Sequence, residues 1–333
     1  MGIGKNICWL GAWLAVASAA AAPIMEVSAP AVYFGMCDAS AGVALATNLF
    51  AVANDEDNVV RTYRTDRTNG PVQTADLSSF LRVDRKWPET DLEGAAWLGD
   101  WIFWIGSHGC NRDGEFRESR HRLFATRLEK TGATLRLAPV GRPYPNLVND
   151  LARDPRLVSF HLAAASRRAP KAPGALNIEG LCATSATNLL IGFRNPVPQG
   201  RALLVPLLNP FEVVAGRPAN FGDPILLDLG GQGIRDLGYW QGKYVIIAGS
   251  YDGAGHSHLF FWKGGAAQPK KAEGVHLKGI NPEAVVVYPG NLEAFQLLSD
   301  DGTMLFNGVD CKKLASPLQR HFRSVWVSKV NLD

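Results

Sequence analysis

The feature that most constrains the fold is a recurring pair of short apolar strands. Each copy opens on polar or acidic residues, forms one apolar strand, turns, and returns as a second apolar strand that stops at glycine or polar residues. The clearest copies occupy 91–108, 177–194, 233–250 and 281–301, and a weaker one occupies 38–55. Most copies are followed by a third strand. Units of three or four antiparallel strands, repeated at about fifty residues, are typical of β-propeller blades.

This pattern predicts an all-β, β-propeller-like fold of five to seven blades. A β-sandwich is the less favoured alternative, because one hairpin pattern recurs five times. The blade number stays open because the step from Glu93 to Glu179 is much longer than the others. That step holds a predicted helix at 144–157 and a loop rich in proline and alanine, so it contains either another blade or one short helical insertion. The last predicted strand, 323–330, is expected to join the first blade and close the ring.

The first residues have the pattern of a cleaved signal peptide. Lys5 precedes a charge-free apolar run over 7–22, which ends in small residues with two A-x-A sequences. The run is shorter than the roughly 20 residues that a membrane span needs. We therefore expect a signal peptide over 1–22 and a single propeller domain over 23–333, with no membrane span in the mature chain. The expected location is periplasmic or secreted.

Four cysteines follow the predicted signal peptide: Cys37, Cys110, Cys182 and Cys311. Their spacings match no zinc site. An oxidising compartment would permit disulfides, and four cysteines can pair in three ways. Cys182 is equally consistent with a buried free thiol in a strand. The net charge is +3 without a dense basic tract, so nucleic acid is not an expected partner.

The openings of the repeats supply the first candidate site residues. In a propeller the first strand of each blade lines the central channel, so these openings meet in space. They hold Glu93, Glu179 and Glu283, together with Arg235 and Asp236. Carboxylates around one axis repel each other unless a cation compensates them, and Ca²⁺ bound by the three glutamates is one possibility. Arg235 could compensate them instead, and the acids could simply accept backbone hydrogen bonds from the next blade.

The loops after the second strands supply His108 and Arg194. With Arg235 and Asp236, these residues predict a site for a small polar or anionic molecule at the central channel. The chain has no recognisable nucleophile–base motif, so no catalytic residue is assigned. Two alternatives stay open. One is a Ca²⁺-dependent hydrolase of a phosphoester, ester or lactone, in which His108 transfers a proton. The other is a protein-interaction scaffold that uses an exposed tryptophan-rich strand at 97–104.

The same motifs carry a family resemblance. Fragments such as 36–40, 92–94, 105–109, 178–180 and 299–302 occur in an order that resembles the bacterial domain-of-unknown-function family 3616. The similarity spans about 32–330, nearly the whole mature chain. It implies a propeller-like fold and frequent export, and it implies no activity. The chain is more loosely similar to the exported phytase-associated esterase-like propellers, which share the Glu-Gly opening and weakly favour hydrolysis.

Overall fold

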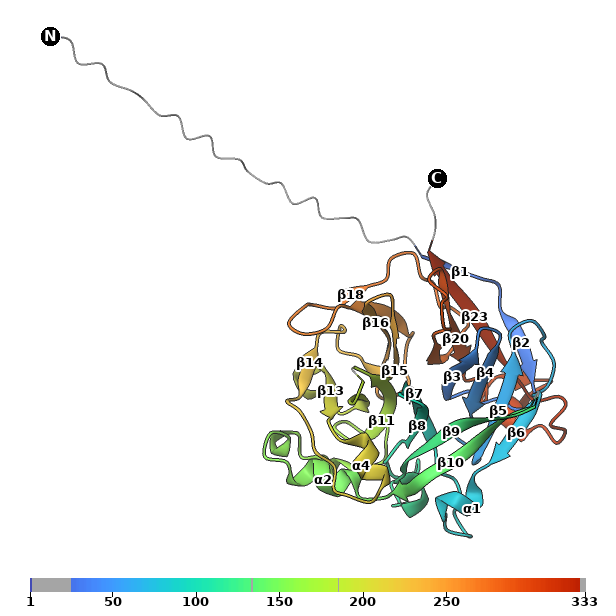
Figure 1. The fold of residues 1–333 in the computed structure, drawn as a ribbon, viewed down its shortest axis with the longest axis horizontal. Helices are drawn as coiled ribbons and strands as arrows, with labels where there is room; N and C mark the ends of the chain where they lie inside the picture. The colour runs from blue at the N-terminus through green and yellow to red at the C-terminus, as the bar shows by residue number, and fades with distance from the viewer. Residues whose placement is uncertain (2–24, 133, 185, 330–333) are drawn as a thin grey trace.

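The chain folds into five antiparallel sheets around one central axis (Figure 1). The computed structural model describes residues 1, 25–132, 134–184 and 186–329, so the predicted signal peptide lies outside the described residues except for Met1. The protein is a five-bladed propeller, at the lower end of the predicted range. The innermost strand of each blade contacts that of the next, and the last contacts the first.

Four blades are built from consecutive strands. From the innermost to the outermost strand, these are β3 (Ala41–Ala46), β4 (Leu49–Ala53), β5 (Val59–Arg64) and β6 (Gln73–Asp76); β7 (Leu92–Leu98), β8 (Trp101–Gly106), β9 (Leu123–Thr131) and β10 (Thr134–Tyr144); β11 (Asn177–Ala183), β12 (Leu189–Asn195), β13 (Ala202–Leu207) and β14 (Ile225–Leu227); and β15 (Gly233–Trp240), β16 (Lys243–Gly249), β17 (His258–Trp262) and β18 (Lys270–Lys271).

The fifth blade joins the two ends of the chain. It takes β19 (Pro282–Val286), β20 (Ala294–Ser299) and β23 (His321–Lys329) from the C-terminal part, and both β1 (Met25–Val27) and β2 (Ala31–Phe34) pair with β23. Figure 1 shows the blue β2 beside the red β23. The prediction that the last strand joins the first blade was therefore wrong. The first blade already has four strands of its own, and the last blade is the one that lacks an outer strand.

Apolar side chains fill the spaces between blades. The buried residues form five hydrophobic clusters, one at each junction between neighbouring blades. Second strands are covered on both faces, and every residue of β12 is buried. A strand of this kind reads in sequence as a continuous apolar run. The hairpin pattern was therefore visible in the sequence because two adjacent blades cover each second strand.

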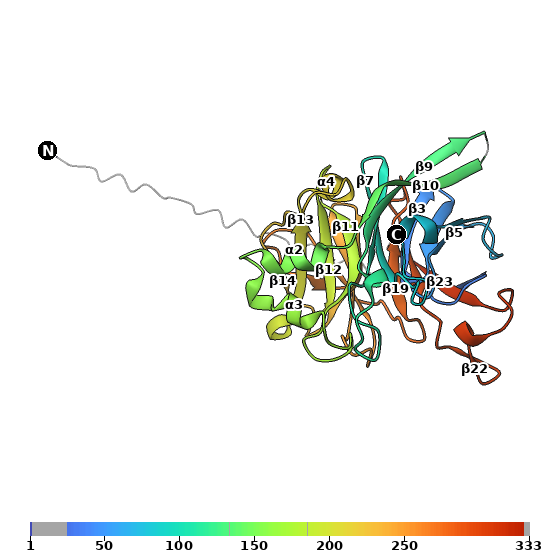
Figure 2. The same ribbon diagram turned by 90° about the horizontal axis from the view of Figure 1, so that it is seen from below.

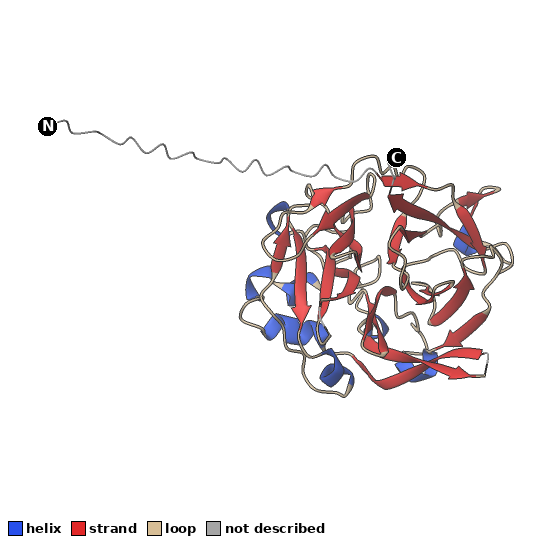
Figure 3. Ribbon diagram, turned by 45° about the horizontal axis from the view of Figure 1, so that its top comes forward, coloured by secondary structure: helices blue, strands red, loops and turns tan. Residues whose placement is uncertain are grey.

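The long step between the second and third blades is an insertion and not another blade. The second blade ends with the long hairpin of β9 and β10, which projects from the body in Figure 2, and the insertion follows β10. The helix α2 (Leu147–Arg153) lies within the predicted helix at 144–157, and the short helix α3 (Leu162–Ala165) lies in the segment predicted to be a loop. Two further short helices, α1 (Ser78–Leu81) and α4 (Pro210–Val214), complete the helical content in Figure 3 apart from 3-10 turns. Among the described residues, no helix is long and apolar enough to span a bilayer.

One disulfide fastens the two ends of the ring. It joins Cys37, which lies between β2 and β3, to Cys311, which precedes β23, across a sequence separation of 274. Cys110 and Cys182 are buried free thiols. The disulfide also anchors the short hairpin of β21 (Leu305–Phe306) and β22 (Val309–Asp310), because Cys311 directly follows it.

We predict that the variant Cys37→Ala/Cys311→Ala is less stable than the wild type by about 2–5 kcal/mol, because a cross-link over a long loop restricts the unfolded chain. Urea unfolding of both proteins measures the difference. A reducing agent should lower the stability of the wild type to that of the variant and leave the variant unchanged. Equal stability of the oxidised wild type and the variant would contradict this role.

Candidate functional site

A polar cavity of about 1020 Å³ lies among the strand openings and loops at one end of the propeller. All five blades contribute residues to it. Its charged lining residues are Asp38, Asp55, Glu56, Glu89, Asp91, Glu93, Arg112, Asp113, Arg117, Arg120, Lys171, Glu179, Arg194, Arg235, Glu283, Asp300, Asp301, Lys312, Lys313 and Arg323. The cavity therefore collects acids and bases that are far apart in the sequence.

A shared backbone irregularity places one charged residue of each of four blades in this cavity. The pairing between the first and second strands skips Glu93 in β7, Glu179 in β11, Arg235 in β15 and Glu283 in β19. Each is the extra residue of a β-bulge, a feature that redirects a side chain away from the regular alternation of a strand. All four line the cavity. The three glutamates thus lie on innermost strands, which is where the repeat places them.

The glycine of the Glu-Gly opening has a separate role in packing. A Cβ at Gly180 would lie 2.6 Å from Cδ2 of Leu237 in the next blade, closer than van der Waals contact allows. Glycine at this position therefore lets neighbouring innermost strands approach one another. The Glu-Gly pair combines a residue that faces the cavity with one that faces the next blade.

Glu179 and Glu283 are compensated by arginine. Arg194 Nη1 lies 2.6 Å from Glu179 Oε1, and Arg235 Nε lies 3.6 Å from Glu179 Oε2. Arg235 also forms an ion pair with Glu283. The arginines are fixed by further bonds, since Arg194 Nε donates to the carbonyl of Ser250 at 3.0 Å and Arg235 Nη1 donates to Asn281 Oδ1 at 2.5 Å. We call Glu179, Arg194, Arg235 and Glu283 the arginine network.

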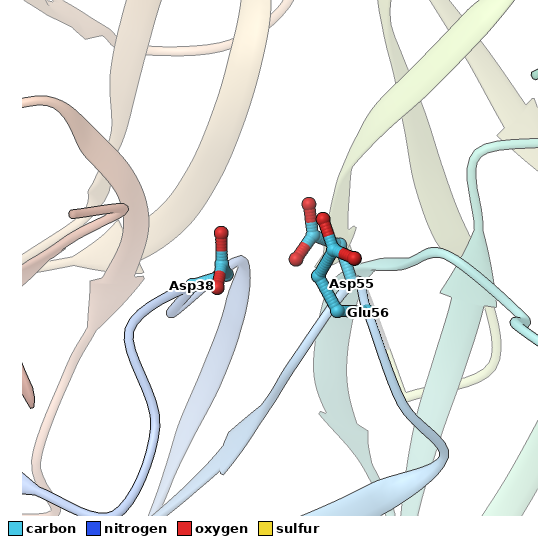
Figure 4. Close-up of side chains that lie close together, drawn as sticks. All are labelled: Asp38, Asp55 and Glu56. Carbon is cyan, nitrogen blue, oxygen red and sulfur yellow. The ribbon is translucent and has the colours of Figure 1, made fainter. Parts of the chain in front are cut away.

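Glu93 belongs to a different group, which consists of acids. One oxygen of Asp55 lies within 4.8 Å of carboxylate oxygens of Asp38 and Glu56, and Asp55 forms a second such group with Asp91 and Glu93. Figure 4 shows the side chains of Asp38, Asp55 and Glu56 projecting toward a common space. We call these five residues the acid cluster. It joins the first and second blades around the shared Asp55.

Two members of the acid cluster have carboxylate oxygens without a protein partner. Glu93 is only 9% exposed, and within the described chain its side chain forms neither a hydrogen bond nor an ion pair. Asp55 Oδ1 is buried and also has no hydrogen-bond partner. Burial, reinforced by neighbouring acids, raises the pKa of both residues well above the ordinary carboxyl range. A bound cation or bound protons would therefore stabilise these carboxylates.

The other members are only partly compensated. Asp91 accepts a bond from Arg120 Nη1 at 2.7 Å, and Glu56 lies 2.5 Å from Lys312 Nζ. Asp38 is buried beside Asp300, and burial together with the charge of Asp300 raises the pKa of Asp38 to about 8. An acid cluster with this distribution can bind a cation through several oxygens, or it can retain protons at neutral pH.

Two predicted ligand-binding residues lie outside the cavity lining. His108 is fully buried with Nδ1 2.8 Å from the carbonyl of Gly106, and burial lowers its pKa to about 3. Asp236 follows the bulge at Arg235 and points to the neighbouring blade, where it accepts a 2.7 Å hydrogen bond from the amide of Val285. Arg194 and Arg235 do line the cavity. Asp236 thus has the structural role that the sequence analysis considered for the glutamates.

The predicted tryptophan-rich docking strand is part of the packed interior. Trp104 is fully buried and Trp97 donates its indole N–H to the carbonyl of Ala44 in the first blade at 2.7 Å. Trp101 is half-buried against Phe211 of α4, with ring centroids 5.1 Å apart. The expectation of an exposed strand was wrong because these rings fill the spaces around the second blade.

The acid cluster contains residues that the sequence analysis did not assign to a site. Asp38 and Asp91 each lie just before an innermost strand, and Asp55 lies just after β4. Their sequence signal is an acid directly beside an apolar strand in two consecutive repeats. This signal is weaker than that of the glutamates, which occupy the same position in several repeats.

A family comparison covers most of the propeller. The family described as "Protein of unknown function (DUF3616)" matches residues 38–142 and 125–289. The chain belongs to this family. The matched segments contain the acid cluster and the whole arginine network, but not Asp300 or the loop that carries Lys312. Membership agrees with the resemblance seen in the sequence and adds no activity.

Other comparisons bear on neither activity nor site. No curated protein matches the chain. Among solved structures, glutaminyl cyclase from Myxococcus xanthus is 12% identical, with 93% of this chain and 98% of that chain covered and a TM-score of 0.48. The PQQ-bound form of aldose sugar dehydrogenase from Streptomyces coelicolor is 13% identical, with 92% and 100% covered and a TM-score of 0.46.

We predict that Glu179→Gln lowers the free energy of unfolding by about 3–5 kcal/mol, because two buried arginines lose their shared carboxylate. The loss should be the same in Ca²⁺ and in chelator, since Glu179 is bound by guanidinium groups. Urea unfolding in both buffers measures it, with the exposed Glu212→Gln as a control that changes stability by less than about 0.5 kcal/mol. A loss that disappears in chelator would instead identify Glu179 as a metal ligand.

We predict that without divalent cations the protein becomes less stable between pH 7 and pH 8.5. Burial raises the pKa of Asp38 to about 8 and raises that of Asp55 well above its ordinary value, so the folded state binds protons that the unfolded state has already released. Stability must then fall as pH rises through this window. Burial lowers the pKa of His108 to about 3 and that of His121 to about 4, so both are neutral in the folded protein. In the unfolded chain they titrate at about pH 6.5, so their opposite effect on stability falls mostly below this window.

Urea unfolding at several pH values in chelator tests the pH prediction. Asp55→Asn should flatten the slope and be more stable than the wild type at pH 8.5, because it removes one of the repelling charges. A wild-type stability that rises between pH 7 and pH 8.5 would show that the acid cluster is not protonated in the folded protein.

Proposed function

We propose that this protein is an exported binding propeller whose central cavity holds a divalent cation, with Ca²⁺ as the best-fitting ion, together with a small polar or anionic molecule. The observation that carries the proposal is the acid cluster around Asp55, in which the buried Glu93 has no protein partner. Such a group is stable at neutral pH only when a cation or protons offset its charge.

The donor set of the acid cluster suits Ca²⁺. Ca²⁺ takes six to eight oxygen ligands at about 2.3–2.6 Å, so two oxygens bound to the same ion lie at most about 5 Å apart. The carboxylate oxygens in each of the two groups lie within 4.8 Å of one another, which fits that limit. The cluster offers no sulfur or imidazole ligand that would favour a softer metal. Asp38, Asp55, Glu56, Asp91 and Glu93 are the residues that would hold the ion.

The arginine network supports the second part of the proposal. Arg194 and Arg235 line the same cavity as the acid cluster, and their charges act on the pKa of acids in it: Arg194 on Glu93 and Arg235 on Asp300. A small molecule in this cavity can therefore place negative oxygen atoms near guanidinium groups or near a bound cation. Polar groups from five blades would select its orientation.

Binding is favoured over hydrolysis by the location of His108. This residue was the candidate for proton transfer, and its ring is buried outside the cavity lining. The described lining contains neither serine nor cysteine that could act as a nucleophile. The geometry thus supports recognition of a ligand more directly than a chemical step.

Export is supported by the disulfide and by the predicted signal peptide. Disulfides persist in oxidising compartments such as the periplasm or the extracellular space. The pair Cys37–Cys311 is a buried cross-link between the first and last blades. A buried disulfide beside the junction that closes the ring suits those compartments.

We predict that Ca²⁺ stabilises the wild type and fails to stabilise Asp55→Asn, because Asp55 belongs to both groups of acids. At a Ca²⁺ concentration of 100 times Kd, the expected gain for the wild type is about 2.7 kcal/mol. Calorimetric titration with Ca²⁺ and urea unfolding measure the two effects. Asp113→Asn is the matched control, because Asp113 lines the same cavity, is exposed and lies outside the acid cluster. Equal loss of Ca²⁺ binding in both variants, or no binding by the wild type, would refute the proposal.

A further inference from the structure

In the arginine network, Nη2 of Arg194 has no hydrogen-bond partner among the described residues. Arg194 uses Nε to bind the carbonyl of Ser250 and Nη1 to bind Glu179. Its Nη2 donates no hydrogen bond to any described residue, although the side chain is only 8% exposed. A guanidinium held by two bonds has a fixed direction for its remaining N–H groups. Arg194 therefore presents a rigid, uncommitted donor at the wall of the cavity.

A second cation lies close to this donor. The ammonium of Lys171, from the loop before β11, has no ion pair or hydrogen bond in the described part of the chain, and Lys171 lines the cavity. Both Arg194 Nη2 and Lys171 Nζ lie 3.3 Å from the position that a Cβ on Gly253 would occupy. Two cationic nitrogens that bind no carboxylate, Arg194 Nη2 and Lys171 Nζ, thus converge on one small space, which is open because residue 253 is glycine.

The surrounding acids do not fill that space. Glu179 binds Arg194 through Nη1 and not through Nη2. Asp252 is adjacent in sequence, but its Oδ1 accepts bonds from Ser250 Oγ at 2.5 Å and from the amide of Ala254 at 2.9 Å. The cation pair therefore has unmet capacity for an acceptor from outside the protein. An oxygen anion is the ligand that a guanidinium and an ammonium recognise together.

We propose that Lys171, Arg194 and Gly253 form an oxyanion subsite that binds the carboxylate or phosphate group of the ligand. This inference rests on the proposed function in one respect, that the ligand occupies the same cavity; it does not require a bound cation. The subsite defines the ligand class more closely: a small molecule with one terminal anionic group, whose remaining part faces the acid cluster or its cation. Gly253 is the specificity-determining residue because any side chain there occupies the anion position.

The loop supplies its own matched control. Gly253 and Gly255 have the same φ of +81° and both line the cavity, so alanine imposes similar backbone strain at either position. A Cβ at Gly255 would meet nothing within 4 Å, whereas a Cβ at Gly253 lies between the two cations. A difference between Gly253→Ala and Gly255→Ala therefore reports the subsite and not the loop conformation.

Ligand-observed NMR titrations with inorganic phosphate and with acetate, both in metal-free buffer, test the subsite. The wild type should bind at least one of them, and the stronger probe identifies the anion as phosphate or carboxylate. Gly253→Ala should weaken that binding at least tenfold, and Gly255→Ala should change it less than twofold. Lys171→Gln, a change at an exposed side chain, should weaken it about fivefold and provides a second test if Gly253→Ala does not fold.

The result is independent of the cation site. Ca²⁺ titration of Gly253→Ala and Lys171→Gln should match the wild type, because neither residue belongs to the acid cluster. Absence of phosphate and acetate binding by the wild type, or equal effects of the two glycine variants together with no effect of Lys171→Gln, would overturn the subsite. Phosphate or acetate binding without Ca²⁺ binding would instead retain the subsite and reject the proposed cation.

Discussion

Closure of the ring is the constraint on which the rest of the structure depends. The N-terminal strands β1 and β2 pair with β23, and the disulfide between Cys37 and Cys311 fastens the segments beside that junction. The acid cluster lies against the same junction. Asp38 follows Cys37 directly and pairs through its backbone with Asp300 of the last blade. An open ring would separate these residues, so the pairing that completes the last blade also holds repelling carboxylates together.

Within the closed ring, the bulges decide which charges face the cavity. Four innermost strands each have one extra residue, and in three of them that residue is glutamate. In the remaining one it is Arg235, which reaches both Glu179 and Glu283. Because this repeated position holds arginine in one blade, the negative charges of Glu179 and Glu283 are offset within the protein. Among the three glutamates, Glu93 is the one that forms no ion pair with an arginine of the described chain.

The sequence predicts the parts of this arrangement that repeat locally. The hairpins were visible because second strands are buried on both faces, and the glutamates were visible because they recur at the start of the first strand of a repeat. The number of blades could not be predicted, because the insertion between β10 and β11 obscures the repeat spacing. The sequence also did not predict that N-terminal strands complete the last blade, because β1 and β2 are short and resemble no repeat. Arg235 and Asp236 looked equivalent, although a bulge directs them to opposite surroundings.

The separation of the site into the acid cluster and the arginine network could not be predicted, because it depends on contacts between residues that are far apart in the sequence. Arg194 comes from β12, a second strand, and its bond to Glu179 of β11 depends on how the two strands pair beyond the bulge. Lys312 pairs with Glu56 of the first blade and directly follows Cys311, whose disulfide joins it to Cys37. Arg194 and Lys312 are bound to Glu179 and Glu56, and neither forms an ion pair with Asp55. Glu93 belongs to the acid cluster and is also affected by the charges of the arginine network. Burial raises its pKa most, the charges of Glu179, Asp91 and Asp55 raise it further, and the charge of Arg194 lowers it. The cavity therefore contains both the partly compensated acid cluster and the donors of Arg194 and Lys171.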